Sequence, residues 1–410
     1  MNTKEILRKA AEAAVSLQMI SDEVVSRVLK DVASALRESS DDILAANARD
    51  LARMSPENPK YDRLKLTPER IDSIASDMEN VAGLPSPLGK ILSETFRPNG
   101  MTIRKVTVPF GVIGVIYEAR PNVTSDAAAL AIKSGNTAIL RGGKEAFNSN
   151  SAIMDIMRNA VEKSGFNPDI IELVRDTSRE SSTALMRMNE FVDVLIPRGS
   201  AKLINAVVQN STVPVIETGA GNCHIYVDEF ADIDMAAEIV FNAKTQRISV
   251  CNTAESLLIH KNIAEFALIA IKAKLDEKNV ILYGDEVACE ICPDIEKATE
   301  EDWATEYLDY KMSVKIVSSL EEATEHIRKY STGHSESIIT ENIENAEKFM
   351  NTVDSSAVYH NASTRFTDGG EFGFGAEIGI STQKLHARGP LGLPQLNSFK
   401  YKIYGNGQVR

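Results

Sequence analysis

The stretch Asn242–Glu255 places a cysteine after two cations, and it contains the chain's best candidate for a nucleophile. Cys251 follows Lys244 by seven residues and Arg247 by four. A thiol attacks as its thiolate, its free pKa is roughly 8.5, and nearby cations lower that pKa. If the intervening loop folds back, either cation reaches the sulfur. Taken alone, these residues also fit a buried structural cysteine beside a solvated basic turn.

A second chemical signal lies at Arg141–Lys144, directly after the expected strand Thr137–Leu140. Open α/β sheets bind ligands at the carboxyl ends of their strands. Gly142 and Gly143 would let a phosphate approach the backbone, and Arg141 and Lys144 would flank it with donors. The turn therefore suits the 2′-phosphate of NADP, with a basic surface turn as the alternative.

A glycine followed by a helix start marks the end of another expected strand, Val192–Ile196. Gly199 and Ser200 would present free backbone N–H groups there, which favour a pyrophosphate. The chain lacks the Gly-x-Gly-x-x-Gly fingerprint of ordinary dinucleotide folds, and Gly219–Gly221 has only part of it. The sequence therefore predicts a nucleotide site built from scattered strand ends.

Several blocks of sequence, in order along nearly the whole chain, resemble one enzyme family. They are Val108–Thr124 with its Tyr-Glu-Ala-Arg-Pro-Asn string, Leu140–Glu145, Val192–Ser200, Pro214–Asp228, Lys244–Thr253, His334–Glu336 and His386–Leu393 with its His-Ala-Arg-Gly-Pro string. The chain resembles the γ-glutamyl phosphate reductases, or glutamate-5-semialdehyde dehydrogenases, of the aldehyde dehydrogenase superfamily.

This resemblance implies a reaction. The expected activity is NADPH-dependent reduction of L-glutamyl 5-phosphate to L-glutamate 5-semialdehyde and phosphate, the second step of proline biosynthesis from glutamate. Cys251 would carry the acyl group as a thioester. The cofactor would be NADP, no metal is expected, and glutamate 5-kinase is a candidate partner. Within the fold, the rival is an acylating aldehyde dehydrogenase that uses coenzyme A or another acyl phosphate. Outside it, the rival is a non-catalytic scaffold.

The resemblance also assigns roles near the nucleophile. The side-chain amide of Asn122 and the backbone N–H of Cys251 would hold the developing oxyanion, although an ungapped alignment from Gly111 places Arg120 at that position. Glu217 precedes Cys251 by 34 residues, the spacing of the water-activating base in hydrolytic relatives. Hydrolysis would waste the acyl phosphate, so the role of Glu217 stays uncertain.

Other residues are expected to hold the substrate or the cofactor. Arg120 and Arg388 are candidates for the substrate phosphate or α-carboxylate. His224 is a third candidate for substrate binding, with a satisfied core histidine as the alternative. Glu306 stands where the superfamily has a carboxylate for the nicotinamide ribose. No histidine or cysteine pair has complete metal-ligand spacing, and Cys289–Cys292, which has the spacing of a redox pair or of half a zinc site, is expected to be an ordinary surface or core pair.

The composition narrows the class of protein. The chain has 410 residues and a net charge of −13, which opposes a nucleic-acid role because phosphate backbones require clustered cations. Four cysteines are too few for a disulfide framework at this length. No apolar run approaches the ~18 residues that cross a bilayer. We therefore expect a cytoplasmic protein.

The periodicity predicts an α/β fold of aldehyde-dehydrogenase type, with two doubly wound parallel-sheet domains and a small β arm for oligomerisation. Residues 1–93 and 110–218 would form the NADP-binding domain, and residues 219–392 the catalytic domain. Residues 94–109 read as a hairpin around Pro-Asn-Gly, and 393–410 would complete the arm. An isolated hairpin is marginal in water, so Asn397–Tyr404 is expected to pair with it. The arm predicts a homo-oligomer, a dimer or a tetramer.

Overall fold

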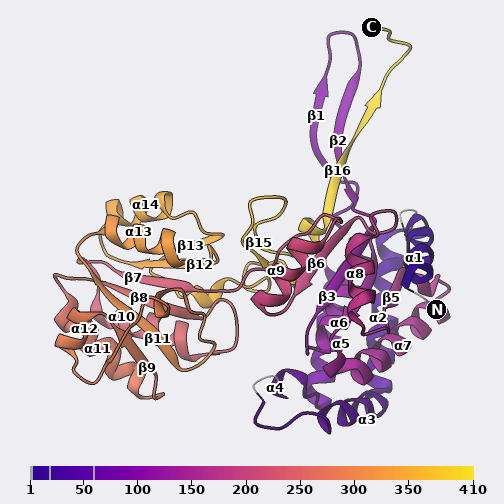
Figure 1. Ribbon diagram of the computed structural model, residues 1–410. Helices are drawn as coiled ribbons and strands as arrows, with labels where there is room; N and C mark the ends of the chain where they lie inside the picture. Colours follow the sequence, from indigo (N-terminus) through magenta and orange to yellow (C-terminus); the bar gives the residue numbers. More distant parts are fainter. Residues whose placement is uncertain (1–2, 18–19, 59–60) are drawn as a thin grey trace.

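The computed structural model describes residues 3–17, 20–58 and 61–410. They form two α/β domains and a projecting arm (Figure 1). The sheet of the first domain has the strand order β5-β4-β3-β6, and all its neighbouring strands run parallel. Its strands are β3 (Val112–Tyr117), β4 (Thr137–Gly142), β5 (Ile171–Leu173) and β6 (Val194–Arg198). Every residue of β3 is buried, as expected for a parallel sheet that is covered on both faces.

Helices cover both faces of this sheet and form two separate apolar cores. One core is formed with α2 (Asp22–Glu38), α5 (Pro68–Gly83), α6 (Asn122–Lys133) and α7 (Phe147–Lys163). The other is formed with α1 (Thr3–Leu17), α8 (Arg179–Arg187) and α9 (Ala201–Asn210). The helices α3 (Ser40–Leu51) and α4 (Tyr61–Leu64) extend the domain at the end away from the arm.

The strand order reverses between β3 and β6, because β4 and β5 lie on one side of β3 and β6 lies on the other. Such a reversal opens a crevice at the carboxyl ends of the strands, where open α/β sheets bind their ligands. The chain after β3, from Glu118 to Asn122, and the chain after β6, from Gly199, therefore border the same crevice.

The second domain has a seven-stranded sheet in the order β10-β9-β11-β8-β7-β12-β13, again with parallel neighbours. Its strands are β7 (Cys223–Val227), β8 (Ala254–His260), β9 (Ile281–Gly284), β10 (Glu296–Lys297), β11 (Lys311–Val317), β12 (Ser335–Ile339) and β13 (Ala357–His360). One face carries α10 (Ile233–Thr245), α11 (Ala264–Asp276) and α12 (Glu286–Ile291), and the other carries α13 (Leu320–Tyr330) and α14 (Ile343–Thr352). The predicted pair of parallel-sheet domains is confirmed.

The arm is a three-stranded antiparallel sheet that projects from the first domain (Figure 1). It consists of β1 (Ile91–Phe96), β2 (Thr102–Pro109) and β16 (Asn397–Tyr404). The predicted pairing is present, since Asn397 lies opposite Pro109 and Tyr404 opposite Thr102. All six residues of β1 are exposed.

Two expectations from the sequence need correction. Residues 376–396, assigned mostly to the catalytic domain, return to the first domain, where Ile378, Leu391 and Leu396 join the core around α2, α5 and α6. This segment contains β14 (Ile380–Ser381) and β15 (Gly389–Pro390). The apolar run Val213–Ile216, whose sequence predicts a further strand of the first sheet, forms only a single bridge, between Val215 and Leu195. No helix among the described ranges is long and apolar enough to cross a membrane.

Candidate active site

Cys251 lines a cavity of about 450 Å³ to which both domains contribute. The cavity is unusually cationic for a chain of net charge −13. Its cationic lining residues are Arg63, Lys65, Arg70, Arg120, Arg198, Arg247 and Arg365. Its acidic lining residues are Asp62, Asp77, Asp368 and Glu377. Clustered guanidinium groups in a concave site suit a phosphate or carboxylate ligand.

A close backbone contact and two side-chain hydrogen bonds hold the loop that carries Cys251. A Cβ on Gly221 would lie 1.4 Å from the carbonyl oxygen of Cys251, so only glycine permits this approach. The Sγ of Cys223 donates to the same carbonyl oxygen at 3.2 Å. The Nδ2 of Asn252 donates to the carbonyl oxygen of Thr367 at 3.0 Å. The loop is therefore fixed from both β7 and the segment after β13.

Burial raises the pKa of the Cys251 thiol above its usual range, and the charge of Glu306 adds to the rise. Arg198 and Arg120 oppose it because a positive charge favours the thiolate. The sequence predicted a thiol with a lowered pKa, so this expectation is corrected. The two arginines are the groups that stabilise the sulfur once it ionises.

Lys244 does not activate the sulfur as the sequence suggested. Its side chain is fully buried and its Nζ donates to the carboxylate of Glu255 at 2.5 Å. Glu255 also accepts a hydrogen bond from the backbone N–H of Leu308 at 3.2 Å. The periodicity of α10 turns Lys244 into the domain core, whereas Arg247, beyond the end of that helix, lines the cavity.

Arg198 is the functional residue that the sequence analysis missed. It ends β6 at the crevice, and its charge acts on Cys251, Arg120 and Glu377. Its Nε and the Nε of Arg63 are buried and have no hydrogen-bond partner. Burial and the nearby charges of Arg198 and Arg63 lower the pKa of Arg120 to about 9. An anion bound here would relieve this repulsion between cations. Its position at the end of an expected strand was the available signal.

Both candidates for the oxyanion position reach this cavity. Asn122 opens α6, and Arg120 lies two residues earlier. Each lines the cavity together with Cys251. The Nδ2 of Asn122 donates to the carboxylate of Asp126 at 2.9 Å, which fixes the orientation of the amide. Asn122 and Arg120 therefore remain paired candidates for this role.

The two glutamates that were singled out from the sequence lie in different surroundings. Glu306 accepts a hydrogen bond from the backbone N–H of Gly221 at 2.8 Å and acts electrostatically on Cys251. The backbone N–H of Glu217 donates to the Oε1 of Gln383 at 2.9 Å. Glu217 does not line the cavity around Cys251. This placement gives no support to a water-activating role for Glu217.

The two cations of the strand-end turn Arg141–Lys144 have different surroundings. Arg141 donates through Nη2 to the carbonyl oxygens of Thr177 and Ser178, at 2.8 and 3.1 Å, and so holds that loop. The side chain of Lys144 is exposed. A Cβ on Gly142 would come within 2.1 Å of the side-chain nitrogen of Asn150. The turn therefore offers one exposed cation beside a close-packed backbone.

The second predicted phosphate position lies at the start of α9. The hydroxyl of Ser200 caps its helix by accepting from the N–H of Leu203, and its own N–H donates to Glu118 at 3.2 Å. The Oγ of Ser200 also donates to Glu118, at 3.1 Å. A Cβ on Gly199 would lie 3.1 Å from the Glu118 carboxylate carbon. An acceptor group of this chain thus sits where a pyrophosphate would bind.

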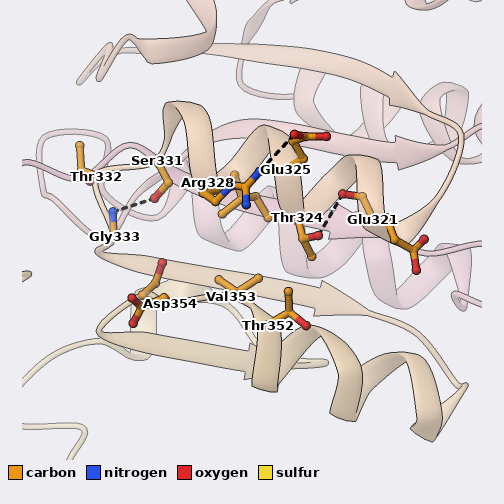
Figure 2. A pocket seen from close by; sticks show the side chains of 12 residues that line it. Glu321, Thr324, Glu325, Arg328, Ser331, Thr332, Gly333, Thr352, Val353 and Asp354 are labelled. Carbon is orange, nitrogen blue, oxygen red and sulfur yellow. Dashed lines mark hydrogen bonds and ion pairs between the residues drawn. The ribbon is translucent and has the colours of Figure 1, made fainter.

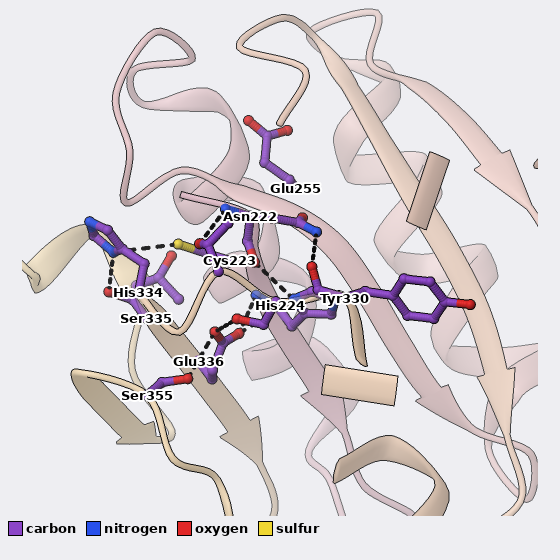
Figure 3. A network of polar contacts seen from close by, with 12 residues as sticks. Asn222, Cys223, His224, Glu255, Tyr330, His334, Ser335, Glu336 and Ser355 are labelled. Atoms are coloured by element: carbon purple, nitrogen blue, oxygen red, sulfur yellow. Dashed lines mark hydrogen bonds and ion pairs between the residues drawn. The ribbon is translucent and has the colours of Figure 1, made fainter. Parts of the chain in front are cut away.

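His224 is fully buried in β7 and lines none of the cavities described here. Its Nδ1 donates to the carbonyl oxygen of Asn222 at 2.9 Å, and its backbone N–H donates to Glu336 at 2.6 Å (Figure 3). Glu336 also accepts from the hydroxyl groups of Ser331 and Ser355. This placement favours the core-histidine alternative over substrate contact.

Arg388 forms an ion pair with Asp354 at 2.8 Å and donates to the backbone carbonyl oxygen of the same residue. Asp354 lines a separate cavity of about 540 Å³ beside α13 (Figure 2). Arg388 does not line the cavity around Cys251. The pair instead joins the returning segment of the chain to the catalytic domain.

Comparisons with known proteins agree with this architecture. The sequence model of the aldehyde dehydrogenase family matches residues 1–309. The solved structure of an acetylating aldehyde dehydrogenase from Geobacillus thermoglucosidasius has a TM-score of 0.72 at 18% identity, covering 100% of this chain and 97% of the other. The arrangement of two parallel-sheet domains with a cysteine between them is therefore that of an aldehyde dehydrogenase.

Closer relatives refine the class. The γ-glutamyl phosphate reductase of Caldanaerobacter subterraneus is 54% identical and that of Clostridium beijerinckii 56%, each over 98% of both chains. The crystal structure of γ-glutamyl phosphate reductase from Thermotoga maritima covers 100% of both chains, with a TM-score of 0.97 and 46% identity. The chain therefore belongs to the γ-glutamyl phosphate reductases of the aldehyde dehydrogenase family.

Replacing Lys244 by Met is expected to lower the free energy of unfolding by about 3–5 kcal/mol, because it leaves the Glu255 charge buried without a cation. Replacing both members by apolar residues should restore most of the loss. Lys274→Met, at a partly exposed ion pair with Glu238, is the control and should cost less than about 1 kcal/mol. Urea unfolding measures these values. A Lys244→Met protein of normal stability with slowed thiol alkylation would contradict the structural role.

Proposed function

We propose that this protein reduces L-glutamyl 5-phosphate to L-glutamate 5-semialdehyde and phosphate with NADPH, as the second step of proline biosynthesis from glutamate. The observation that carries the proposal is the position of Cys251 in a cavity lined by unpaired guanidinium nitrogens. A cysteine nucleophile beside an anion site is what an acyl phosphate requires. The names of the full-length relatives supply the acyl group, glutamyl.

The first step forms the thioester. The thiolate of Cys251 attacks the acyl carbon, a C–S bond forms, and the C–O bond to phosphate breaks. Arg198 and Arg120 stabilise the thiolate before attack and the departing phosphate after it. The backbone N–H of Cys251 and the side chain of Asn122 or Arg120 hold the oxyanion of the tetrahedral intermediate.

The second step reduces the thioester. When bound, NADPH supplies the hydride for this step. Lys144 would offer an exposed cation to the 2′-phosphate, whereas a pyrophosphate at the start of α9 would have to displace the Glu118 carboxylate from Ser200. Glu306 is the carboxylate for the nicotinamide ribose. The Cys251 thiohemiacetal then breaks its C–S bond, the aldehyde leaves, and the arginines again face a thiolate.

The arm is proposed to join copies of this chain. It exposes large apolar side chains on β1 and β16, among them Phe96, Phe399, Tyr401 and Ile403. A thin sheet with this much exposed apolar surface gains stability when a second copy covers it. This supports the predicted homo-oligomer and leaves the number of copies open.

Cys251→Ser is expected to abolish turnover without unfolding the protein, because a hydroxyl is a much weaker nucleophile without an activating base. The assay follows NADP reduction with glutamate semialdehyde and phosphate, and circular dichroism checks the fold. Cys289→Ser in α12, outside the cavity, is the matched control. A serine variant that keeps more than about a tenth of the rate, a loss of only ~1.4 kcal/mol, would eliminate the covalent mechanism.

Lys144→Ala should raise the Michaelis constant for NADPH far more than that for NADH, since only NADPH carries the extra phosphate. A lost charge-assisted contact costs about 1.5–3 kcal/mol. Arg141→Ala should act in the same direction, with an added general loss because its guanidinium holds the loop at Thr177. Lys163→Ala, at the end of α7, is the control. If the variants raised the Michaelis constants for NADPH and NADH equally, this turn would not be the site that binds the 2′-phosphate.

Phosphate should be required in the oxidative direction, because it is the acyl acceptor. Glu217→Gln should then change phosphate-dependent turnover only modestly, in keeping with its place outside the cavity. Product analysis with and without phosphate makes the test. A hydrolytic enzyme would form glutamate without phosphate and lose roughly 10²- to 10⁴-fold when its general base is removed. That second pattern would overturn the proposed reaction.

A further inference from the structure

A second cavity of about 290 Å³ adjoins the first and has the opposite charge. We call it the acidic pocket, and it is lined by Asp77, Met78, Val81, Ser125, Asp126, Ala129, Asp368, Gly370, Gly375, Ala376 and Glu377. Four of these residues carry carboxylates, and no lysine, arginine or histidine of the described chain lines the pocket. Its ligand, on charge alone, is a cation.

The acidic pocket is continuous with the cavity of Cys251. Asp77, Asp368 and Glu377 line both. Asp126 lies in the acidic pocket and accepts a hydrogen bond from Asn122, which lines the cavity of Cys251. A molecule whose reacting carbon lies at the sulfur could therefore extend into the acidic pocket.

Glu377 forms the wall between the two cavities, and its Oε2 is buried without a hydrogen-bond partner. Burial raises the pKa of Glu377 to about 7, with Arg198 opposing the rise. Burial also raises the pKa of Asp126 to about 7, and the charge of Asp77 adds to that rise. A buried carboxylate oxygen without a hydrogen bond destabilises the folded protein, and a bound N–H donor would supply that hydrogen bond.

We propose that the acidic pocket binds the α-ammonium group of the glutamyl substrate, with Glu377 and Asp126 as the residues that select for it. This inference rests on the proposed function and deepens it. The acyl carbon of glutamyl phosphate would face Cys251, its phosphate the arginines, and its ammonium group the carboxylates. The amino-bearing carbon is the third carbon from the acyl carbon, and the residues shared by the two cavities allow one ligand to enter both.

This placement has a chemical consequence. The neutral amine of glutamyl phosphate can attack its own acyl carbon, forming a C–N bond and a five-membered lactam, 5-oxoproline, while the C–O bond to phosphate breaks and the amine loses a proton to water. The Cys251 thioester can close in the same way and expel the thiolate. An ammonium group has no lone pair for this attack. Carboxylates that favour the charged amine therefore protect the acyl group.

The test compares two aldehydes in the oxidative direction with NADP and phosphate: L-glutamate 5-semialdehyde and 5-oxopentanoate, which has the same carbon chain without the amino group. The wild-type protein should prefer the amino substrate by at least about tenfold in kcat/KM, as expected for a lost charge-assisted contact. Glu377→Gln and Asp126→Asn should each reduce that preference at least about tenfold. Glu371→Gln, an exposed carboxylate that lines neither cavity, should keep the wild-type ratio.

Equal losses for both aldehydes in Glu377→Gln would overturn the proposal, because a group that serves the thiol or the fold does not distinguish the substrates. A wild-type protein that oxidises neither aldehyde would instead contradict the proposed function itself. The same variants should release more 5-oxoproline per NADPH formed when phosphate is omitted. Equal amounts from wild-type and variant proteins would overturn the protective role of the pocket.

Discussion

The site depends on one close approach, that of the Gly221 backbone to the backbone of Cys251. No side chain fits between them, since an added Cβ would overlap the Cys251 carbonyl oxygen. This contact lets Cys223 donate to the same carbonyl and lets Glu306 accept from the N–H of Gly221. These contacts fix the segments that precede β7, β8 and β11 around the sulfur. A nucleophile must be held within a fraction of an ångström, and here a close backbone contact holds it together with the side chains of Cys223 and Glu306.

The second constraint is electrostatic. Although the chain is acidic overall, several of its arginines lie together in the cavity between the two domains. Arg198 interacts electrostatically with Cys251, Arg120 and two carboxylates, those of Glu377 and Asp126. The cleft therefore has positively charged side chains on one side and carboxylates on the other. In the proposed complex the phosphate would face the cations and the ammonium group the carboxylates, which would be specificity through charge placement.

The parts of this arrangement that were predictable from sequence are those with local or periodic signals. Alternating strands and helices predicted both sheets, and the period-two pattern of Asn397–Tyr404 predicted its pairing with the hairpin. Lys244 was misplaced because spacing along the chain does not show that a helix turns this residue toward Glu255. Arg198 and the return of residues 376–396 to the first core depend on contacts between distant segments. The position of Arg198 at a strand end was a local signal, but its charge couplings to Cys251 and Glu377 have none.

The raised pKa of Cys251 and the arginine cluster together suit a reversible acyl transfer. A raised thiol pKa lowers the fraction of reactive thiolate, and with it the reactivity toward oxidants. In the proposed reaction, negative charge would pass from the sulfur to the phosphate oxygens as the C–S bond forms and the C–O bond breaks. Arg198 and Arg120 face one anion before the step and another after it, so they need not move. Cations that stabilise the anion before the step and the anion after it also stabilise the negative charge in the transition state. Preorganised charges lower the barrier most at that point.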